Sequence, residues 1–262
     1  MYYLFLAWAA GIPYIGTPQG SDILIKPFSS RFYKYFSIKS LNNAKAITVD
    51  SNKMKEKVFE LSGVKAHVIQ NGIDLEAINI FLNQIKQTHI NRTVLLSMRG
   101  FTQLYRINTI LTTRNSSIKS SDLPITFIYP FYENEYMKAT LSLFNNGDKD
   151  LGRIDRITMY ELLFSTKLVF SIPLSDSSPR SVYEAIFCGC AVAITHHSYF
   201  DILPECMKSR IILVDLDKKD WLDIAIEQAD KIIIEPYLPS EEALNMFDQK
   251  RSFRIISELL FS

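Results

Sequence analysis

The chain has 262 residues, of which 47% are hydrophobic and 22% charged, and its formal net charge is +1. This length and composition allow one or two packed domains and exclude wholesale disorder. Cys188, Cys190 and Cys206 are an odd number of cysteines without metal-like pairing, which argues against a disulfide scaffold and favours a reducing compartment. No apolar run reaches the roughly eighteen residues of a membrane-spanning helix.

The charge is unevenly distributed along the chain. Residues 1–92 hold 11 Lys and Arg against 6 Asp and Glu, a net charge of +5, and the rest of the chain has a net charge of −4. This asymmetry suggests that the first part meets an anionic partner such as phosphates or lipid head groups. Chance scatter over a solvated surface explains it equally well.

The first part alternates between strand and helix patterns. Residues 1–10 are apolar but lack the charged start and cleavage site of a signal peptide, so we expect a buried helix that ends at Gly11. Ser51 is a good N-cap and Gly63 a good stop for a second helix. Strands are expected at residues 12–15, 46–50 and 66–69, followed by a turn at Asn71–Gly72 and a polar helix at 75–87.

The second part repeats this alternation with longer apolar runs. The expected strands are residues 94–98, 125–129, 168–172, 191–195 and 211–214, and the expected helices lie near 107–113, 133–144, 158–165, 180–187 and 220–234. Apolar strands separated by helices indicate a doubly wound parallel sheet covered on both faces. We expect one domain at 1–90, a second at 91–238, and C-terminal helices at 239–262 that pack back toward the first.

The densest group of polar residues is SDSSPRSVYEA at 175–185, which follows an expected strand and opens an expected helix. Ligands of doubly wound folds bind at the carboxyl ends of strands, and the first turn of a helix attracts phosphate. The carboxylates of Asp176 and Glu184 can accept hydrogen bonds from two different hydroxyl-bearing parts of one ligand. Helix capping by Ser177 or Ser178 explains part of this composition, but not the two carboxylates with Ser181 between them.

Residues 151–195 resemble the donor-binding half of the family-four retaining glycosyltransferases. The resemblance rests on Leu151-Gly152-Arg153, on Tyr160-Glu161-Leu162-Leu163, and on the run SDSSPRSVYEAIFCGCAVAI. The family signature is a carboxylate, seven residues, Glu-Ala and a glycine-containing turn, matched here by Asp176, Glu184 and Gly189. Asp176 replaces the usual glutamate and shortens its reach by one methylene.

Weaker matches extend this resemblance over nearly the whole chain. Residues 13–24 resemble the middle of the first domain, 44–51 and 68–74 the run into the interdomain linker, and 96–101 with Tyr105 the start of the second domain. The resemblance implies an α/β fold of the GT-B class, with two Rossmann-like doubly wound domains. The first domain is expected to be incomplete and N-terminally shortened.

The resemblance also assigns roles to individual residues. Glu184 would bind the ribose of a nucleotide sugar, Asp176 the transferred sugar, and Ser181 the phosphate. Arg99 would bind the diphosphate and act with Asp176 in catalysis, since a guanidinium presents several donors to phosphate oxygens. Further donor-binding residues are expected at Arg106, the only nearby substitute for a lysine common in the family, and at Ser178, Gly20, Ser21 and Asn71.

The expected activity is transfer of a sugar, with retention of configuration, from a nucleotide sugar to a growing glycan in polysaccharide or lipopolysaccharide assembly. Such a bacterial hexosyltransferase needs no metal or cofactor, acts on a glycan or lipid-linked glycan, and has no nucleic-acid partner. It is expected in the cytoplasm or peripherally on the inner membrane. Aromatic residues interleaved with basic ones at 26–39 would rest there on anionic lipid. Burial of half of these rings in the core explains the pattern equally well.

Two alternatives from other classes stay open. Gln19 stands where the family commonly has histidine, and an amide cannot act as a charged imidazolium. With the short first domain, this favours a catalytically inactive nucleotide-sugar-binding or partner subunit. The second alternative is an unrelated doubly wound enzyme, such as a sugar-nucleotide epimerase, which would react with free nucleotide sugar without an acceptor.

Overall fold

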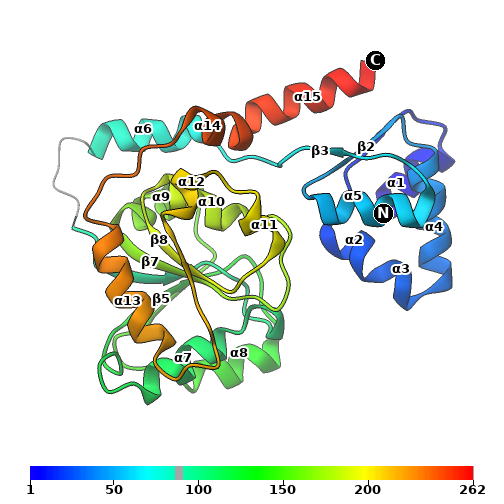
Figure 1. Ribbon diagram of the computed structural model, residues 1–262. Helices are drawn as coiled ribbons and strands as arrows, with labels where there is room; N and C mark the ends of the chain where they lie inside the picture. Colours follow the sequence, from blue (N-terminus) through cyan, green and yellow to red (C-terminus); the bar gives the residue numbers. More distant parts are fainter. Residues whose placement is uncertain (86–90, 262) are drawn as a thin grey trace. The chain divides into compact units, whose positions relative to one another are not determined.

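The computed structural model describes residues 1–85 and 91–261, which form two compact units (Figure 1). The first unit comprises Met1–Asp74, Asp176–Ser178 and Asn245–Ser262, and the second comprises Leu75–Ser175 and Pro179–Leu244. The domain boundary expected near residue 90 lies at the edge of the undescribed residues, and the division instead follows Asp74.

Helix α6 explains this difference in the boundary. It spans Leu75–Ile85, although its end had been expected at residue 87, which lies outside the described residues. It packs on α9 (Arg156–Ser165) of the second unit, where the ring centroid of Phe81 lies 5.8 Å from that of Tyr160. The α6 segment therefore belongs to the second unit, although it precedes the apolar runs of that unit in sequence.

The second unit contains a parallel sheet of six strands in the order β6-β5-β4-β7-β8-β9. Its strands are β4 (Val94–Ser97), β5 (Ile125–Ile128), β6 (Lys149–Gly152), β7 (Thr166–Ser171), β8 (Ala191–Ile194) and β9 (Ile211–Leu213). Five of them coincide with the expected apolar runs. Strand β6 was not expected, because this edge strand is polar and mostly exposed and has no apolar run.

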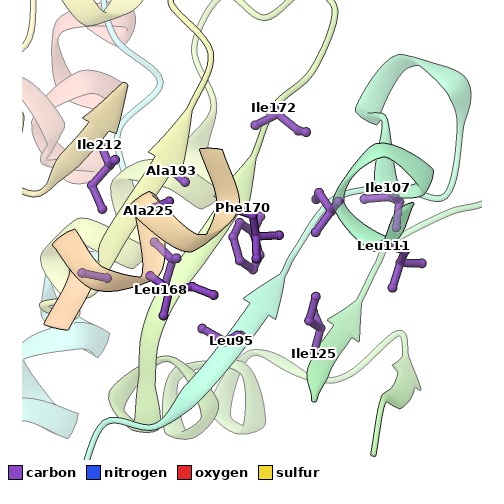
Figure 2. Close-up of a cluster of buried hydrophobic side chains, with 14 of the residues drawn as sticks. Leu95, Ile107, Leu111, Ile125, Leu168, Phe170, Ile172, Ala193, Ile212 and Ala225 are labelled. Carbon is purple, nitrogen blue, oxygen red and sulfur yellow. The ribbon is translucent and has the colours of Figure 1, made fainter. Parts of the chain in front are cut away.

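Helices cover both faces of this sheet, as expected for a doubly wound unit. In Figure 1, α7, α8 and α13 lie on one face and α9 and α10 on the other. The bounds are α7 Ile107–Ser116, α8 Asn134–Leu141, α10 Arg180–Phe187 and α13 Trp221–Ile232, with a short 3-10 helix η1 at Gln103–Tyr105 and short helices α11 at Ser198–Asp201 and α12 at Glu205–Lys208. Side chains from α7 and α13 meet those of the strands in one core, in which Phe170 is fully buried (Figure 2).

The first unit is built on a smaller parallel sheet, in the order β1 (Ile15–Gly16), β2 (Ala46–Val49) and β3 (His67–Val68). Its helices are α1 (Tyr2–Ala9), α2 (Gly20–Leu24), α3 (Lys26–Ser29), α4 (Arg31–Asn42), α5 (Asn52–Ser62) and α15 (Gln249–Phe261). Helix α5 has the expected ends. The Met54 amide donates to Ser51 Oγ at 3.3 Å, and Gly63 closes the helix with a φ of 73°.

The prediction of a buried first helix is wrong. Helix α1 forms at the expected residues, but it has no buried side chain. Phe5 packs its ring against Phe36 of α4, with 4.0 Å between the centroids, whereas Tyr2 and Tyr3 are 69% and 82% exposed. An apolar sequence cannot reveal that only one side of the helix is covered.

The C-terminal residues are helical, as the sequence indicates. Helix α14 spans Glu241–Phe247, and the division between the units falls within it, after Leu244. Residues 245–262 belong to the first unit, where the Ile73 amide donates to the Phe247 oxygen at 2.7 Å. Gly72 permits this close approach: its φ is 64°, and a Cβ there would lie 2.6 Å from the Gln249 nitrogen.

All three cysteines are free thiols, in line with the expectation of no disulfide scaffold. Burial raises the pKa of both Cys188 and Cys190. Cys206 is only half-buried. Burial raises its pKa, but its hydrogen bonds with the hydroxyl and the backbone amide of Ser240 outweigh this effect and lower the pKa overall. Within residues 1–85 and 91–261, no helix is long and apolar enough to cross a membrane.

Candidate functional site

The nine residues expected in the site divide between the two units. Arg99, Arg106, Ser181 and Glu184 belong to the second unit, and Gly20, Ser21, Asn71, Asp176 and Ser178 belong to the first. The structure therefore assembles two groups of these side chains, each with its own neighbours.

Arg99 lies just beyond the carboxyl end of β4 and is held from two sides. Its guanidinium carbon lies 4.5 Å from the centroid of the Tyr105 ring, and its Nη1 donates to Ser181 Oγ at 2.9 Å. Ser181 is in the first turn of α10, where backbone N–H groups lack partners within the helix. A cation beside the start of a helix suits a phosphate or another anion.

Glu184 follows one turn later on the same helix. It is only 7% exposed, and Arg156 Nη2 lies 3.6 Å from its Oε1. Partial compensation by this cation makes burial of the carboxylate tolerable. Glu184 and Ser181 line one pocket of about 210 Å³, whose apolar wall consists of Met98, Ile128, Pro130, Ile154 and Met159.

Tyr129 and Arg153 complete the polar part of this pocket. The Tyr129 hydroxyl donates to Asp150 Oδ2 at 3.2 Å. Burial and the Asp150 carboxylate raise the pKa of Tyr129 to about 12, so its hydroxyl keeps its proton at neutral pH. The pocket thus combines an apolar wall with a buried carboxylate, a combination that fits a nucleoside.

Arg106 does not have the surroundings of a phosphate ligand. Its Nε donates to the Ile172 oxygen at 2.7 Å and its Nη2 to the Pro173 oxygen at 2.8 Å. Burial lowers the pKa of this guanidinium. These contacts give Arg106 a structural task, and its expected donor-binding role stays a prediction.

In the first unit, the residues at 176–178 pack beside the ends of β2 and β3. Ser178 Oγ donates to Gln70 Oε1 at 2.8 Å, and Ser177 Oγ donates to Asp50 Oδ2 at 3.0 Å. Asp176 Oδ1 accepts from the Ser177 amide at 2.9 Å. The acidic loop is thereby anchored by its serines, while Asp176 itself is half-buried.

Gly20 starts helix α2 in the same unit, after Gln19 at the N-cap. A Cβ on Gly20 would lie 3.1 Å from Ser177 Oγ, so glycine allows a close approach to the acidic loop. Ser21 is exposed in the first turn of α2, and Asn71 is half-buried after β3. Of the expected site residues, Gly20, Asp176 and Ser178 thus share one neighbourhood.

Asp50 is a residue that the sequence analysis did not select. It directly follows β2, is 7% exposed, and its Oδ1 has no hydrogen-bond partner among the described residues. Burial raises the pKa of Asp50, hydrogen bonds from Ser177 and Ser51 oppose this, and the Asp176 charge adds to the rise. A carboxylate at the carboxyl end of a parallel strand was the available signal.

The described residues include no cluster of three His, Cys, Asp or Glu side chains that could hold a metal ion. The positively charged side chains of the second-unit site are arginines, chiefly Arg99 and Arg156. Guanidinium groups bind phosphate and carboxylate oxygens with paired hydrogen bonds.

Comparison with known proteins supports the fold. Residues 1–77 match the family model described as Glycosyltransferase Family 4. Anabaena HepE, solved with UDP and glucose, is 16% identical over 99% of this chain and 74% of its own, with a TM-score of 0.74. Sucrose-phosphate synthase from Thermosynechococcus elongatus is 12% identical over 98% of this chain and 70% of its own, with a TM-score of 0.70.

The chain has the GT-B fold. The α/β, Rossmann-like class expected from the sequence is thereby confirmed. A further neighbour is a Staphylococcus aureus TarM mutant in complex with fondaparinux, alpha-GlcNAc-glycerol and UDP. It is 13% identical over 96% of this chain and 51% of its own, with a TM-score of 0.62.

No curated protein matches the sequence. The residues that match the family model lie almost entirely in the first unit, whereas the resemblance seen in the sequence rests mainly on residues 151–195.

Proposed function

We propose that the protein is a glycosyltransferase that moves a hexose from a nucleotide sugar to a hydroxyl of a growing glycan, with retention of configuration. One observation carries the proposal. Arg99 is fixed at the first turn of α10, and the buried carboxylate of Glu184 lies one turn further on, beside an apolar pocket. Phosphate, ribose and base of a nucleotide follow one another in the same order.

The neighbours support a nucleotide sugar as donor. HepE was solved with UDP and glucose, TarM with UDP, and an Escherichia coli neighbour with UDP-2-fluoro glucose. On this chain Glu184 would accept hydrogen bonds from the ribose hydroxyls, while Arg99 and the amides of α10 would hold the diphosphate. Asp176 would accept hydrogen bonds from hydroxyls of the transferred sugar.

The transfer breaks the bond between the sugar's anomeric carbon and the donor phosphate, and forms a bond from that carbon to the acceptor oxygen. The acceptor proton passes to the departing phosphate oxygen, so no dedicated general base is needed. Arg99 stabilises the charge that develops on the leaving diphosphate, and the protein acts otherwise by positioning the reacting groups. The protein supplies this charge from its own side chain, and the proposal includes no metal or cofactor.

A binding titration combined with a transfer assay tests this function. We expect wild-type protein to bind UDP and to release UDP from a UDP-hexose. Glu184→Gln should weaken the binding of UDP about tenfold or more, because it removes a charged hydrogen-bond acceptor. Glu161→Gln, an exposed change on α9, is the matched control. Equal UDP affinity in Glu184→Gln and wild type would refute the assignment of the site.

The same assay distinguishes the alternative function. UDP binding without sugar release or transfer would identify an inactive nucleotide-sugar-binding subunit. Gln19 is the observation that favours this alternative, because its amide caps α2 and cannot carry the charge of an imidazolium. Conversion of free UDP-sugar without UDP release would instead identify an epimerase.

We further propose that the acceptor is lipid-linked and that the first unit rests on the anionic cytoplasmic surface of a bacterial inner membrane, where polysaccharide or lipopolysaccharide is assembled. Helices α1 and α4 pack together and both carry exposed side chains, which are Tyr2 and Tyr3 on α1, and Phe32 and Tyr35 with the basic Arg31 and Lys34 on α4. Other rings, such as Phe36, are half-buried, so this stretch is part core and part surface. Exposed rings insert at the head-group level, and the cations attract anionic lipid.

Vesicle flotation tests this contact. The protein should float with vesicles rich in phosphatidylglycerol and not with pure phosphatidylcholine, and 0.5 M salt should weaken the association. Phe32→Ser with Tyr35→Ser should abolish it while UDP binding is kept. Flotation that is indifferent to lipid charge and to both substitutions would refute it, as would a stable dimer that covers these residues.

A further inference from the structure

Arg106 has an unusual backbone conformation. Its φ is 52° and its ψ is 39°, the left-handed region, and the other positive φ values of the described chain belong to glycines. A Cβ disfavours this region, so such conformations persist only where surrounding contacts hold them. Arg106 both ends η1 and precedes α7.

The Arg106 side chain is fastened to the end of β7. Two of its hydrogen bonds reach the backbone oxygens of Ile172 and Pro173, the residues that follow the strand, and a third reaches Thr195 Oγ1 at 3.4 Å. The Pro173 oxygen lies also 3.3 Å from Thr195 Oγ1 and 3.2 Å from His197 Nε2. Arg106, Thr195 and His197 thus converge on one carbonyl at the exit of the strand.

A backbone bond joins the same two segments. The Leu174 amide donates to the Leu104 oxygen at 2.8 Å. Leu104 lies within η1 and precedes Tyr105, the ring on which the Arg99 guanidinium stacks. The turn that shapes the surroundings of Arg99 is therefore tied to the strand exit by this bond and by Arg106.

We propose that Arg106 is a positioning residue: it locks the η1 turn to the end of β7, so that Tyr105 holds Arg99 beside Ser181. A planar guanidinium can donate to two neighbouring carbonyls at once, whereas a lysine ammonium lacks this fork. Arg106 would thus act on the donor phosphates only through Arg99. Its effect on ligand binding rests on the proposed function, but its effect on the turn does not.

Hydrogen exchange tests the lock without any ligand. Arg106→Gly is the informative variant, because glycine adopts a positive φ freely and the guanidinium is removed without adding backbone strain. Peptides covering residues 100–108 and 170–176 should exchange faster in Arg106→Gly, and Arg106→Lys should restore little of the protection. Arg254→Ala, which removes an exposed arginine from α15, should match wild type. Unchanged exchange in both peptides of Arg106→Gly would overturn the proposal.

A double-mutant cycle with UDP tests whether Arg106 acts through Arg99. Arg106→Gly should weaken UDP binding about tenfold in the wild-type background, comparable to the loss of one charged hydrogen bond. It should have little further effect in Arg99→Ala, because coupled residues are not additive. Equal weakening in both backgrounds would instead indicate direct phosphate contact and overturn the proposal. If wild type bound no UDP, the donor assignment would fail, and the exchange experiment would still judge Arg106.

Discussion

The two units differ in how their cores are built. In the second unit, strands of three to six residues pair into a six-stranded sheet whose core spans both central strands and two helices. In the first unit, β1 and β3 have two residues each, and the core consists of Ile23, Leu41, Ile47, Val49, Met54, Val58 and Ala66. The first unit also exposes the rings of α1 and α4.

This contrast extends to the candidate site residues. Arg99, Ser181 and Glu184 are attached to central elements of the larger sheet, β4 and α10. Gly20, Asp50 and Asp176 depend on loops that are held by serine and glutamine hydrogen bonds. The candidate residues of the second unit are thus held by regular elements, and those of the first unit by loop contacts.

The largest expected effect comes from a buried ion pair in the second unit. Arg114 Nη2 lies 2.7 Å from Asp148 Oδ2, and both side chains are 0% exposed. Asp148→Asn should destabilise the second unit by about 3–5 kcal/mol, because it leaves a buried guanidinium without a countercharge. The chain has two tryptophans, Trp8 in the first unit and Trp221 in the second. In a Trp8→Phe background, Trp221 is the remaining tryptophan, so its fluorescence during urea unfolding should report the loss of stability in the second unit.

The matching change in the first unit is Leu41→Ala. Leu41 is 0% exposed in the smaller core, and its truncation should cost about 2–3 kcal/mol through lost burial and the cavity left behind. This loss of stability is measured by Trp8 fluorescence during urea unfolding in a Trp221→Phe background. Each substitution should shift the transition of its own unit more than the other. Equal shifts of both transitions would show that the chain unfolds as one cooperative body and would remove the contrast.

Arg99→Lys sharpens the contrast at the site. A lysine keeps the charge but loses the fork that reaches Ser181 and the stacking on Tyr105. UDP affinity should fall about tenfold, or about 1.4 kcal/mol, as measured by calorimetry. Arg254→Lys is the matched control and should bind UDP as wild type does. Full retention of affinity in Arg99→Lys would mean that the planar group is not needed.

The smallest effect is expected at Asp50 and depends on pH. Burial raises the pKa of Asp50 in the folded protein, so the folded state binds its proton more tightly than the unfolded state. The stability from this group is present below the unfolded pKa and is lost as pH rises through the folded pKa. Asp50→Asn should therefore raise the melting temperature at pH 7, and this gain should shrink toward pH 4. Glu56→Gln, exposed on α5, should show no such trend.

The sequence predicts the second unit well because its strands are apolar and its helices have clear ends. Helix α10 occupies the expected residues 180–187. The polar strand β6 gave no signal, since edge strands need no apolar run. For α1 the composition indicated a helix correctly but could not show which side is covered, because coverage depends on partners far away in sequence.

The candidate site residues also differ in how far their positions could be predicted from the sequence. Arg99, Ser181 and Glu184 could be grouped from sequence because each follows a strand end or occupies a helix face of known spacing. Arg106 could not be assigned, because a long side chain near a strand end can turn toward a ligand or toward the backbone. In the structure this side chain turns to the backbone oxygens of Ile172 and Pro173.

The unequal environments of the three cysteines allow one thiol to be labelled selectively. Thiolates, not thiols, react with maleimides, so Cys188 and Cys190 should remain untouched in the folded protein while Cys206 is alkylated. A fluorescent dye could thus be attached to the second unit of the unaltered chain at a single position. Uptake of dye beyond one equivalent would then report, in real time, on opening of the sheet that encloses the other two sulfurs.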